Sequence, residues 1–224
     1  MKIALLTYNY PHRKTQDVLF RLLVKGFKDI TLVILPWAVR DNFKPLYSHR
    51  PTNEICVYPG DLAKTFGVES IYIPNYSHLQ AIDVDYFIIG GAGIINPLPD
   101  VPVINSHPGY LPIVRGLDAL KWAVYYRLKI GVTVHRINKD IDSGDIIERK
   151  EIFPCPGEQF YHFAMRQYNE EITMLVDYFS NSPQKIDDDY YSWRPPQPMR
   201  RMSHGKELKM MRIFESGLLD DPKL

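Results

Sequence analysis

The residues best suited to chemistry lie in the stretch Val101–Pro112, VPVINSHPGYLP, where an apolar run passes into a polar, turn-rich segment. Asn105 and His107 are two positions apart, and in an extended backbone this spacing sends both side chains to the same side. Pro108 biases His107 toward an extended conformation. The pattern therefore predicts that an amide donor and a titratable imidazole face one cleft.

A second polar stretch, Lys139–Asp145, reads KDIDSGD. Its three carboxylates, Asp140, Asp142 and Asp145, are more than a turn needs. Asp and Gly are nevertheless ordinary turn formers, so the loop alone favours a plain turn over a catalytic site. A lone histidine is likewise most often structural. The two stretches gain meaning only if the fold brings them together.

The elements that must position these residues follow from apolar periodicity. Uniformly apolar runs of strand length, rich in Ile and Val, are typical of strands buried on both faces of a mainly parallel sheet. Between them lie amphipathic helical stretches, because apolar residues recur at helical spacing and a glycine ends each stretch. The predicted strands are Ile3–Leu6, Ile30–Leu35, Ser70–Ile73, Tyr86–Ile89 and Val101–Ile104, and the predicted helices are Thr15–Gly26 and Asp61–Gly67.

The pattern changes after position 105. A helix is predicted over Leu117–Leu128, and Gly131–Ile137 alternates imperfectly, as a half-exposed strand does. Ile146–Phe153 would pair with it as an antiparallel neighbour around the turn Asn138–Asp145. Gly157–Phe179 reads as a second long helix. The predicted fold class is α/β, with a mixed, mainly parallel twisted sheet flanked by helices in a Rossmann-like arrangement.

Composition shifts after Ser180, where prolines and charges cluster. We therefore expect a catalytic domain over residues 1–180 and a C-terminal arm over 181–224 with a short helix near Glu207–Phe214. The arm could pack on its own domain or contribute to a dimer contact.

Global composition excludes several classes of function. With 27 basic and 26 acidic residues the net charge is +1, so neither nucleic acid nor a membrane surface is an expected partner. The two cysteines, Cys56 and Cys155, form no ligand cluster, which argues against a zinc site and fits a reducing, cytoplasmic compartment. The short apolar run at the amino terminus reads as a buried strand and not as a signal peptide or membrane span.

Taken together, NSHPGYLPIVRG and the later DIDSGDII closely resemble the folate-dependent formyltransferase family, over roughly positions 84–152. That family includes glycinamide ribonucleotide transformylase, methionyl-tRNA formyltransferase and the sugar nucleotide N-formyltransferases. The resemblance implies that Asn105, His107 and Asp142 are catalytic. It also implies 10-formyltetrahydrofolate as the formyl donor, with no metal.

The resemblance further implies that the pterin lies against the strand end Ile88–Ile95 and the loop Asn138–Asp142, where mostly backbone groups bind the ring. Glycines without side chains permit such close approach. A dinucleotide fingerprint is the alternative, but the GxGxxG spacing is absent because position 96 is asparagine. The expected cofactor-binding residues are Ile88, Gly90, Gly91, Gly93, Ile95, Asn138, Lys139 and Asp142.

The expected acceptor is an amine on a nucleotide-linked sugar, such as a 4-amino-4,6-dideoxyhexose used for bacterial surface polysaccharide. Relative to the family, the first loop has no glycine-rich phosphate turn, and the chain has neither a basic excess nor many residues after Phe179. The alternatives are another small amine such as glycinamide ribonucleotide, a hydrolase, or a non-catalytic folate or nucleotide-binding module. A homodimer is expected by analogy. The expected substrate-binding residues are Tyr8, Asn9, Tyr10, His12, Arg13, Tyr110 and Arg115.

Overall fold

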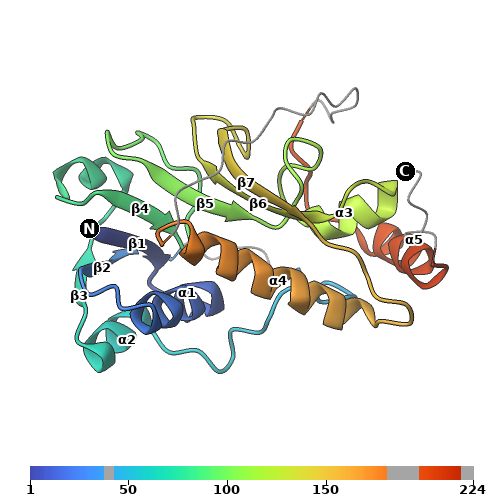
Figure 1. The fold of residues 1–224 in the computed structure, drawn as a ribbon, viewed down its shortest axis with the longest axis horizontal. Helices are drawn as coiled ribbons and strands as arrows, with labels where there is room; N and C mark the ends of the chain where they lie inside the picture. Colours follow the sequence, from blue (N-terminus) through green and yellow to red (C-terminus); the bar gives the residue numbers. More distant parts are fainter. Residues whose placement is uncertain (38–42, 181–196, 218–224) are drawn as a thin grey trace.

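One seven-stranded sheet forms the centre of the molecule (Figure 1). The computed structural model describes residues 1–37, 43–180 and 197–217. Strand order is β3-β2-β1-β4-β5-β6-β7; the first five strands are parallel, and β6 and β7 are antiparallel to their neighbours. This confirms the predicted mixed, mainly parallel sheet. The strands are β1 Ile3–Tyr8, β2 Ile30–Leu35, β3 Glu69–Tyr72, β4 Tyr86–Ile89, β5 Val103–His107, β6 Gly131–Arg136 and β7 Asp145–Glu151.

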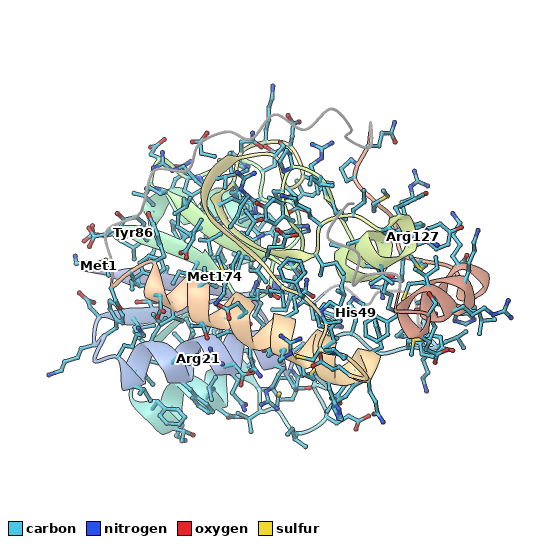
Figure 2. The ribbon with its side chains drawn as sticks, turned by 45° about the vertical axis from the view of Figure 1, so that its right-hand side comes forward. Met1, Arg21, His49, Tyr86, Arg127 and Met174 are labelled. Carbon is cyan, nitrogen blue, oxygen red and sulfur yellow. The ribbon has the colours of Figure 1, made fainter. Side chains whose placement is uncertain are left out.

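Two helices, α1 and α4, lie side by side on one face of the sheet (Figure 1). Arg21 of α1, labelled in Figure 2, reaches α4 and donates to the Asn169 carbonyl at 3.1 Å. A short 3-10 helix, η1, contributes to the packing of the opposite face. The helices are α1 Arg13–Val24, α2 Pro59–Phe66, η1 Tyr76–Ala81, α3 Ala119–Tyr126, α4 Phe160–Asp177 and α5 His204–Glu215.

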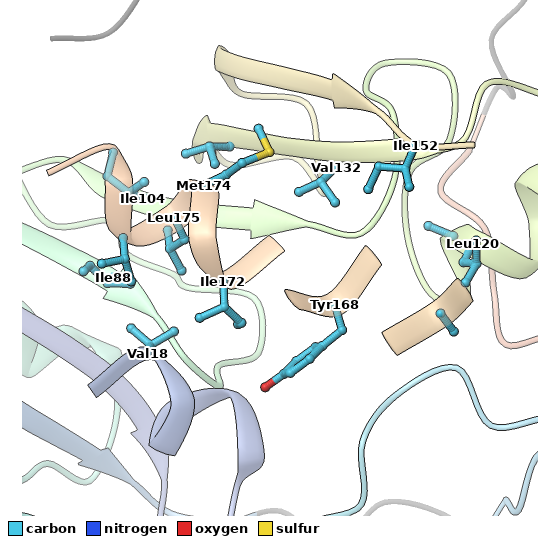
Figure 3. Close-up of a cluster of buried hydrophobic side chains, with 14 of the residues drawn as sticks. Val18, Ile88, Ile104, Leu120, Val132, Ile152, Tyr168, Ile172, Met174 and Leu175 are labelled. Carbon is cyan, nitrogen blue, oxygen red and sulfur yellow. The ribbon is translucent and has the colours of Figure 1, made fainter. Parts of the chain in front are cut away.

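Alternate residues of the central strands supply two cores. In β1, Leu5 packs into the cluster beneath α1 and α4, whereas Leu6 packs into the cluster on the opposite face. The first cluster joins Val18 of α1 to Ile104 of β5 and Ile172 of α4, all fully buried (Figure 3). Burying each such side chain contributes about 1.5–3 kcal/mol. The sheet is therefore fixed from both sides, and its strand ends are rigid supports for a site.

Two expected exposures were wrong. The strand predicted at Ser70–Ile73 is β3, whose residues are mostly exposed because β3 lies at the sheet edge beside β2 alone. The strand predicted at Gly131–Ile137 was expected to be half-exposed, yet residues 131–135 of β6 are buried. The reason is that β6 lies between β5 and β7 and contacts α4.

Strand β5 also differs from the expected Val101–Ile104. It begins at Val103 and continues through His107, so the candidate residues lie within the strand and not after it. Proline lacks an amide hydrogen for ladder pairing, which is consistent with a start just after Pro102.

The C-terminal part of the described chain packs on α3. Lys121 of α3 and Glu207 of α5 form a fully buried ion pair, and the Glu207 carboxylate also accepts from the Leu46 amide at 2.9 Å. Helix α5 spans His204–Glu215 where a helix near 207–214 was expected. The proline-rich beginning of the predicted arm, residues 181–196, and the chain end, 218–224, lie outside the described residues.

Candidate active site

Strand β5 positions the first two candidate residues. Asn105 and His107 alternate with Ile104 and Ser106, which face α1 and α4, so the candidate pair points to the opposite face of the sheet. Antiparallel pairing places Asn105 opposite His135 and His107 opposite Thr133 of β6. Asn105 is partly exposed, whereas only 4% of His107 is exposed. The amide is therefore more accessible than the imidazole.

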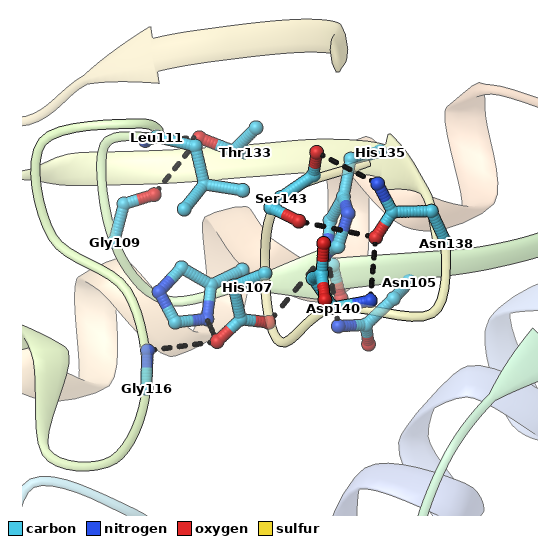
Figure 4. Close-up of polar contacts among 12 residues, drawn as sticks. Asn105, His107, Gly109, Leu111, Gly116, Thr133, His135, Asn138, Asp140 and Ser143 are labelled. Atoms are coloured by element: carbon cyan, nitrogen blue, oxygen red, sulfur yellow. Dashed lines mark hydrogen bonds and ion pairs between the residues drawn. The ribbon is translucent and has the colours of Figure 1, made fainter. Parts of the chain in front are cut away.

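The loop after β6 contains Asp142. Figure 4 shows Asn138, Asp140 and Ser143 of this loop beside Asn105 and His107. A carboxylate oxygen of Asp142 lies 3.4 Å from Nδ1 of His107 and accepts from the Gly116 amide at 2.8 Å. Asp142 has a φ of 46°, a left-handed conformation that costs of order 1–3 kcal/mol in a non-glycine residue and persists only where its surroundings hold it. The structure thus brings Asn105, His107 and Asp142 together.

Asn138 holds the loop in shape. Its side-chain oxygen accepts from the Asp140 amide at 2.9 Å and from the Ser143 hydroxyl at 3.1 Å, and its amide nitrogen donates to the Ser143 carbonyl at 3.1 Å. These bonds close the turn that contains Asp142, and Figure 4 shows them between Asn138, Asp140 and Ser143. Asn138 therefore shapes the turn that presents the carboxylate, and its expected binding of the cofactor stays a prediction.

His107 is held from both sides. Its Nε2 lies 2.9 Å from the Val114 carbonyl, and its Nδ1 faces Asp142. Both ring nitrogens therefore face acceptors. Gly109 makes room for this arrangement, because a Cβ there would lie 2.6 Å from His107 Nε2. The imidazole is thus fixed in orientation between the Val114 carbonyl and the Asp142 carboxylate.

His135 is a site residue that we did not predict. Its Nε2 lies 3.2 Å from Nδ2 of Asn105 and 3.9 Å from a carboxylate oxygen of Asp142. Burial, followed by the neighbouring His107, lowers the pKa of His135 to about 4 against the opposing effect of Asp142. Because Asn105 and His135 are paired across β5 and β6, their side chains lie on the same face of the sheet. At neutral pH the ring is uncharged and accepts from the Asn105 amide.

A buried charge cluster behind β5 was also missed. Glu171 of α4 is fully buried and pairs with Lys14 at 2.8 Å and with Arg50, and the Ser106 hydroxyl donates to it at 3.3 Å. Lys14 also donates to the Ser106 carbonyl at 3.0 Å. The cluster therefore fixes the backbone between the two candidate residues of β5.

The pKa shifts of this cluster follow from burial and pairing. Burial lowers the pKa of Lys14, and Glu171 opposes that shift. Burial by itself raises the pKa of Glu171, but the cations of Arg50 and Lys14 outweigh it and bring the pKa to about 2. The carboxylate is thus charged throughout the physiological range.

The expected cofactor loop follows β4. The amides of Gly90 and Gly91 both donate to the Leu6 carbonyl at 3.0 Å, and the Gly93 amide donates to the Tyr76 hydroxyl at 2.7 Å. These amides are already bonded within the protein. Ile88 and Ile95 are buried, whereas Asn138 and Lys139 are exposed. Cofactor binding by these residues stays a prediction.

The expected acceptor residues divide into two groups. Tyr8, Asn9, Tyr10, His12 and Arg13 gather where β1 ends and α1 begins. Tyr110 lies apart from them: 9% of it is exposed, and the cations of Arg149 and Lys129 lie 5.1 and 5.3 Å from its ring centre. Arg115 is partly exposed in the loop before α3.

Within residues 1–37, 43–180 and 197–217, no cluster of three or more His, Cys, Asp or Glu side chains could hold a metal ion. Among the helices described, none combines the length and apolar character that a membrane crossing requires.

Comparison with known sequences points to one family. The profile of the family described as formyl transferase matches residues 75–178, which include Asn105, His107, His135 and Asp142. A methionyl-tRNA formyltransferase of Sulfurimonas denitrificans is 30% identical over 123 residues, a match covering 52% of this chain and 41% of that protein. The chain therefore spans less than half the length of this relative. The resemblance noted in the sequence is confirmed.

Solved structures share the fold. A sugar N-formyltransferase from Shewanella superposes with a TM-score of 0.58 at 17% identity, covering 95% of this chain and 87% of that one. A phosphoribosylglycinamide formyltransferase from Streptococcus pneumoniae superposes with a TM-score of 0.57 at 18% identity, covering 79% of this chain and 95% of that one. At such identities the likeness concerns the fold, which is that of the formyltransferases.

Proposed function

We propose that this chain, which carries a formyl transferase domain over residues 75–178, is a folate-dependent N-formyltransferase. The formyl donor is 10-formyltetrahydrofolate. The observation that carries the proposal is the convergence of three polar side chains from separate segments, with His107 Nδ1 3.4 Å from the Asp142 carboxylate and Asn105 two residues away on the same face of β5.

The chemistry follows from these positions. The neutral acceptor amine attacks the formyl carbon directly, a C–N bond forms, and negative charge develops on the former carbonyl oxygen. The Asn105 amide carries two hydrogens, so one can bond His135 while the other stabilises this oxyanion. The ammonium formed by the attack loses its proton to the His107–Asp142 pair. Collapse of the adduct breaks the bond to N10 of the folate, which takes up a proton as it leaves.

For the acceptor we favour the amino group of a nucleotide-linked sugar, such as a 4-amino-4,6-dideoxyhexose, destined for surface polysaccharide. The segment Tyr8–Arg13, YNYPHR, runs from the end of β1 to the start of α1 and has two tyrosines and no glycine. This composition suits a bulky, ring-bearing acceptor better than a small phosphate. The net charge is close to zero, so the protein has no overall positive field that would attract tRNA. Glycinamide ribonucleotide, or a non-catalytic folate or nucleotide-binding module, is the alternative.

The proposal includes the setting of the reaction. We place it in the cytoplasm, where reduced folates and nucleotide sugars occur, with residues 1–180 as the catalytic unit, residues 181–224 as an arm, and a homodimer as the expected assembly. Cys56 and Cys155 are both free thiols, as a reducing compartment requires.

The test is incubation with 10-formyltetrahydrofolate and water alone, glycinamide ribonucleotide, or a panel of amino sugar nucleotides. We expect tetrahydrofolate release, followed by absorbance, only with a sugar nucleotide, whose mass gains one formyl group. Release with water alone would instead show a hydrolase. Turnover with glycinamide ribonucleotide alone would support that alternative, and folate binding without turnover would support a binding module.

Substitutions test the proposed roles of Asn105 and His107. Asn105→Ala should lower kcat by about 100- to 1000-fold, as loss of one oxyanion donor does elsewhere. His107→Asn should be comparably impaired, and the exposed His162→Asn serves as the matched control. A near-normal rate for Asn105→Ala would remove the proposed mechanism.

A further inference from the structure

An aromatic cluster lies where β1 and β2 end. The rings of Tyr10 and Trp37 are stacked, with centroids 4.6 Å apart and planes 17° apart. Tyr8, the last residue of β1, meets Trp37 edge-on at 5.1 Å and 80°. The strands that carry these residues are paired in parallel, with Tyr8 opposite Leu35. The cluster therefore lies at the carboxyl edge of the sheet, where ligands of open α/β sheets bind.

We propose that Tyr10 and Trp37 form the stacking platform for the base of a nucleotide. This inference rests on the proposed function and names the part of the acceptor that gives it affinity. Bases stack on aromatic side chains because both have extended π-faces, and the contact tolerates different bases. The ligand class is a nucleoside diphosphate linked to a sugar.

The degree of burial suits a binding surface. Tyr8 is 9% exposed and is anchored in the core, whereas Tyr10 is 38% exposed. Trp37 is partly buried against the same core cluster. The buried Tyr8 ring thus holds the partly exposed rings of Tyr10 and Trp37 in a fixed orientation. Little conformational entropy is therefore lost when the base of a nucleotide stacks on them.

The platform and the candidate active site share one face of the sheet. Tyr8 and Trp37 belong to the same core cluster as Val103, which points to the same side of β5 as Asn105. Strand order places β2 three strands from β5. At about 4.8 Å per strand the separation is about 14 Å. A ribose, two phosphates and a hexose bridge a distance of this order between a base and a distal sugar amine.

The glycine loop after β4 packs against the aromatic cluster. The Gly91 backbone lies beside Tyr8 and His12, because a Cβ there would be 3.1 Å from atoms of both rings. Gly93 lies near the Tyr8 hydroxyl, 3.8 Å from the corresponding position. The glycine loop after β4 therefore connects the aromatic cluster to the strand next to β5.

The start of α1 lies beside this path, because His12 and Arg13 follow Tyr10 closely. The helix begins without a side-chain cap and without an acidic residue in its first turn, so its positive end is not neutralised there. A diphosphate lying between the base and the sugar would meet the start of this helix.

A second stacked aromatic pair lies on α3 and has a structural role. Trp122 and Tyr126 of α3 also stack, with centroids 5.7 Å apart and planes 15° apart. The Trp122 indole donates to the Arg200 carbonyl at 2.7 Å and is 6% exposed. That pair ties the C-terminal part of the described chain to α3 and provides a matched control for the Tyr10–Trp37 platform.

The test measures nucleotide binding without catalysis. Calorimetry with dTDP, UDP and GDP should give binding, whereas glucose 1-phosphate, which lacks a base, should bind far more weakly. Trp37→Leu and Tyr10→Leu should each weaken nucleotide binding by about 5- to 150-fold, the range for loss of one base–aromatic stack. Tyr10→Phe keeps the ring and should bind normally, as should Tyr126→Leu.

The outcomes separate this inference from the proposed function. Equal nucleotide affinity in wild type, Trp37→Leu and Tyr10→Leu would overturn the platform, even if sugar nucleotides are formylated. Ring-dependent nucleotide binding without formylation of any sugar nucleotide would support the platform and remove the proposed function. A thermal melt checks folding, and if Trp37→Leu does not fold, the more exposed Tyr10→Leu decides the outcome.

Discussion

Nδ2 of Asn105 lies 3.2 Å from Nε2 of His135, across the antiparallel pairing of β5 and β6. His135 is uncharged at neutral pH because burial and His107 bring its pKa to about 4. A neutral imidazole nitrogen can accept from the amide, whereas a charged one could not. The contact therefore orients the amide that we assign to the oxyanion.

His135→Phe should lower kcat about fivefold with little change in KM for the acceptor, because an orienting hydrogen bond has a net value of about 1 kcal/mol. Steady-state kinetics on wild type, both single variants and the double variant check this. In an Asn105→Ala background the same substitution should have almost no effect, since the residue to be oriented is gone. An undiminished effect of about fivefold there would contradict the positioning role.

Stability should depend on pH through His135. Its folded-state pKa of about 4 is below the ordinary value of 6.5, so between these values the unfolded state binds more protons. The free energy of unfolding should therefore rise as the pH increases from about 4 to about 6.5. Urea unfolding at several pH values should show a shallower rise for His135→Gln.

The control for this experiment is the exposed His162→Gln, which should keep the wild-type slope. Part of the slope should survive in His135→Gln, because burial also lowers the pKa of His49. Glu171, with a pKa of about 2, acts in a lower window, where its stabilising contribution is lost as the pH falls from about 4.5. Identical slopes for wild type and His135→Gln would refute the assignment.

Glu171→Gln should destabilise the protein by about 3–5 kcal/mol, because it leaves the cations of Lys14 and Arg50 without their buried partner. The adjacent Glu170 is the matched control. It pairs with Lys150 at 2.7 Å, but the Lys150 side chain is 55% exposed, so Glu170→Gln should cost at most about 1 kcal/mol. Urea unfolding measures the free energy of unfolding of both variants. Equal losses of stability would show that the buried ion pairs stabilise the protein no more than the exposed pair does.

Gly109→Ala should abolish most activity although no proposed catalytic residue is substituted. The added Cβ would lie 2.6 Å from His107 Nε2 and 2.7 Å from the Val114 carbonyl, so the imidazole must move. At Gly205 of α5, no atom of the described residues lies within 4 Å of the place that a Cβ would take. Gly205→Ala should therefore leave kcat unchanged and stabilise the helix by about 0.5–1 kcal/mol. Kinetics and urea unfolding of both variants check this, and full activity in Gly109→Ala would show that the position of His107 is not critical.

Local pattern predicted much of this protein. The apolar runs at Ile30–Leu35 and Tyr86–Ile89 are strands with those bounds, because residues buried on both faces leave an uninterrupted signal. The two-residue spacing placed Asn105 and His107 on one side, because a strand has a period of two. The motif resemblance added Asp142, which lies in another segment.

Exposure was harder to predict, because it depends on neighbours and not on the strand itself. The apolar content of β3 suggested a buried strand, and the alternation of β6 suggested a half-exposed one. The sheet order imposes the reverse, because it places β3 at an edge and β6 between two strands. Neither position can be read from a strand's own residues.

The roles of the residues around the candidate site also depend on their neighbours in the fold. His135, Lys14 and Glu171 carry no local signal of a role, since each lies in an ordinary helix or strand pattern. Their roles arise from the pairing of β5 with β6 and from the packing of α1 and α4 behind β5. Sequence alone therefore determined which backbone segments form and which side chains can do chemistry. Only the tertiary structure decided which distant groups meet, because hydrogen bonding and charge pairing act over a few ångströms of space, whatever the separation along the chain.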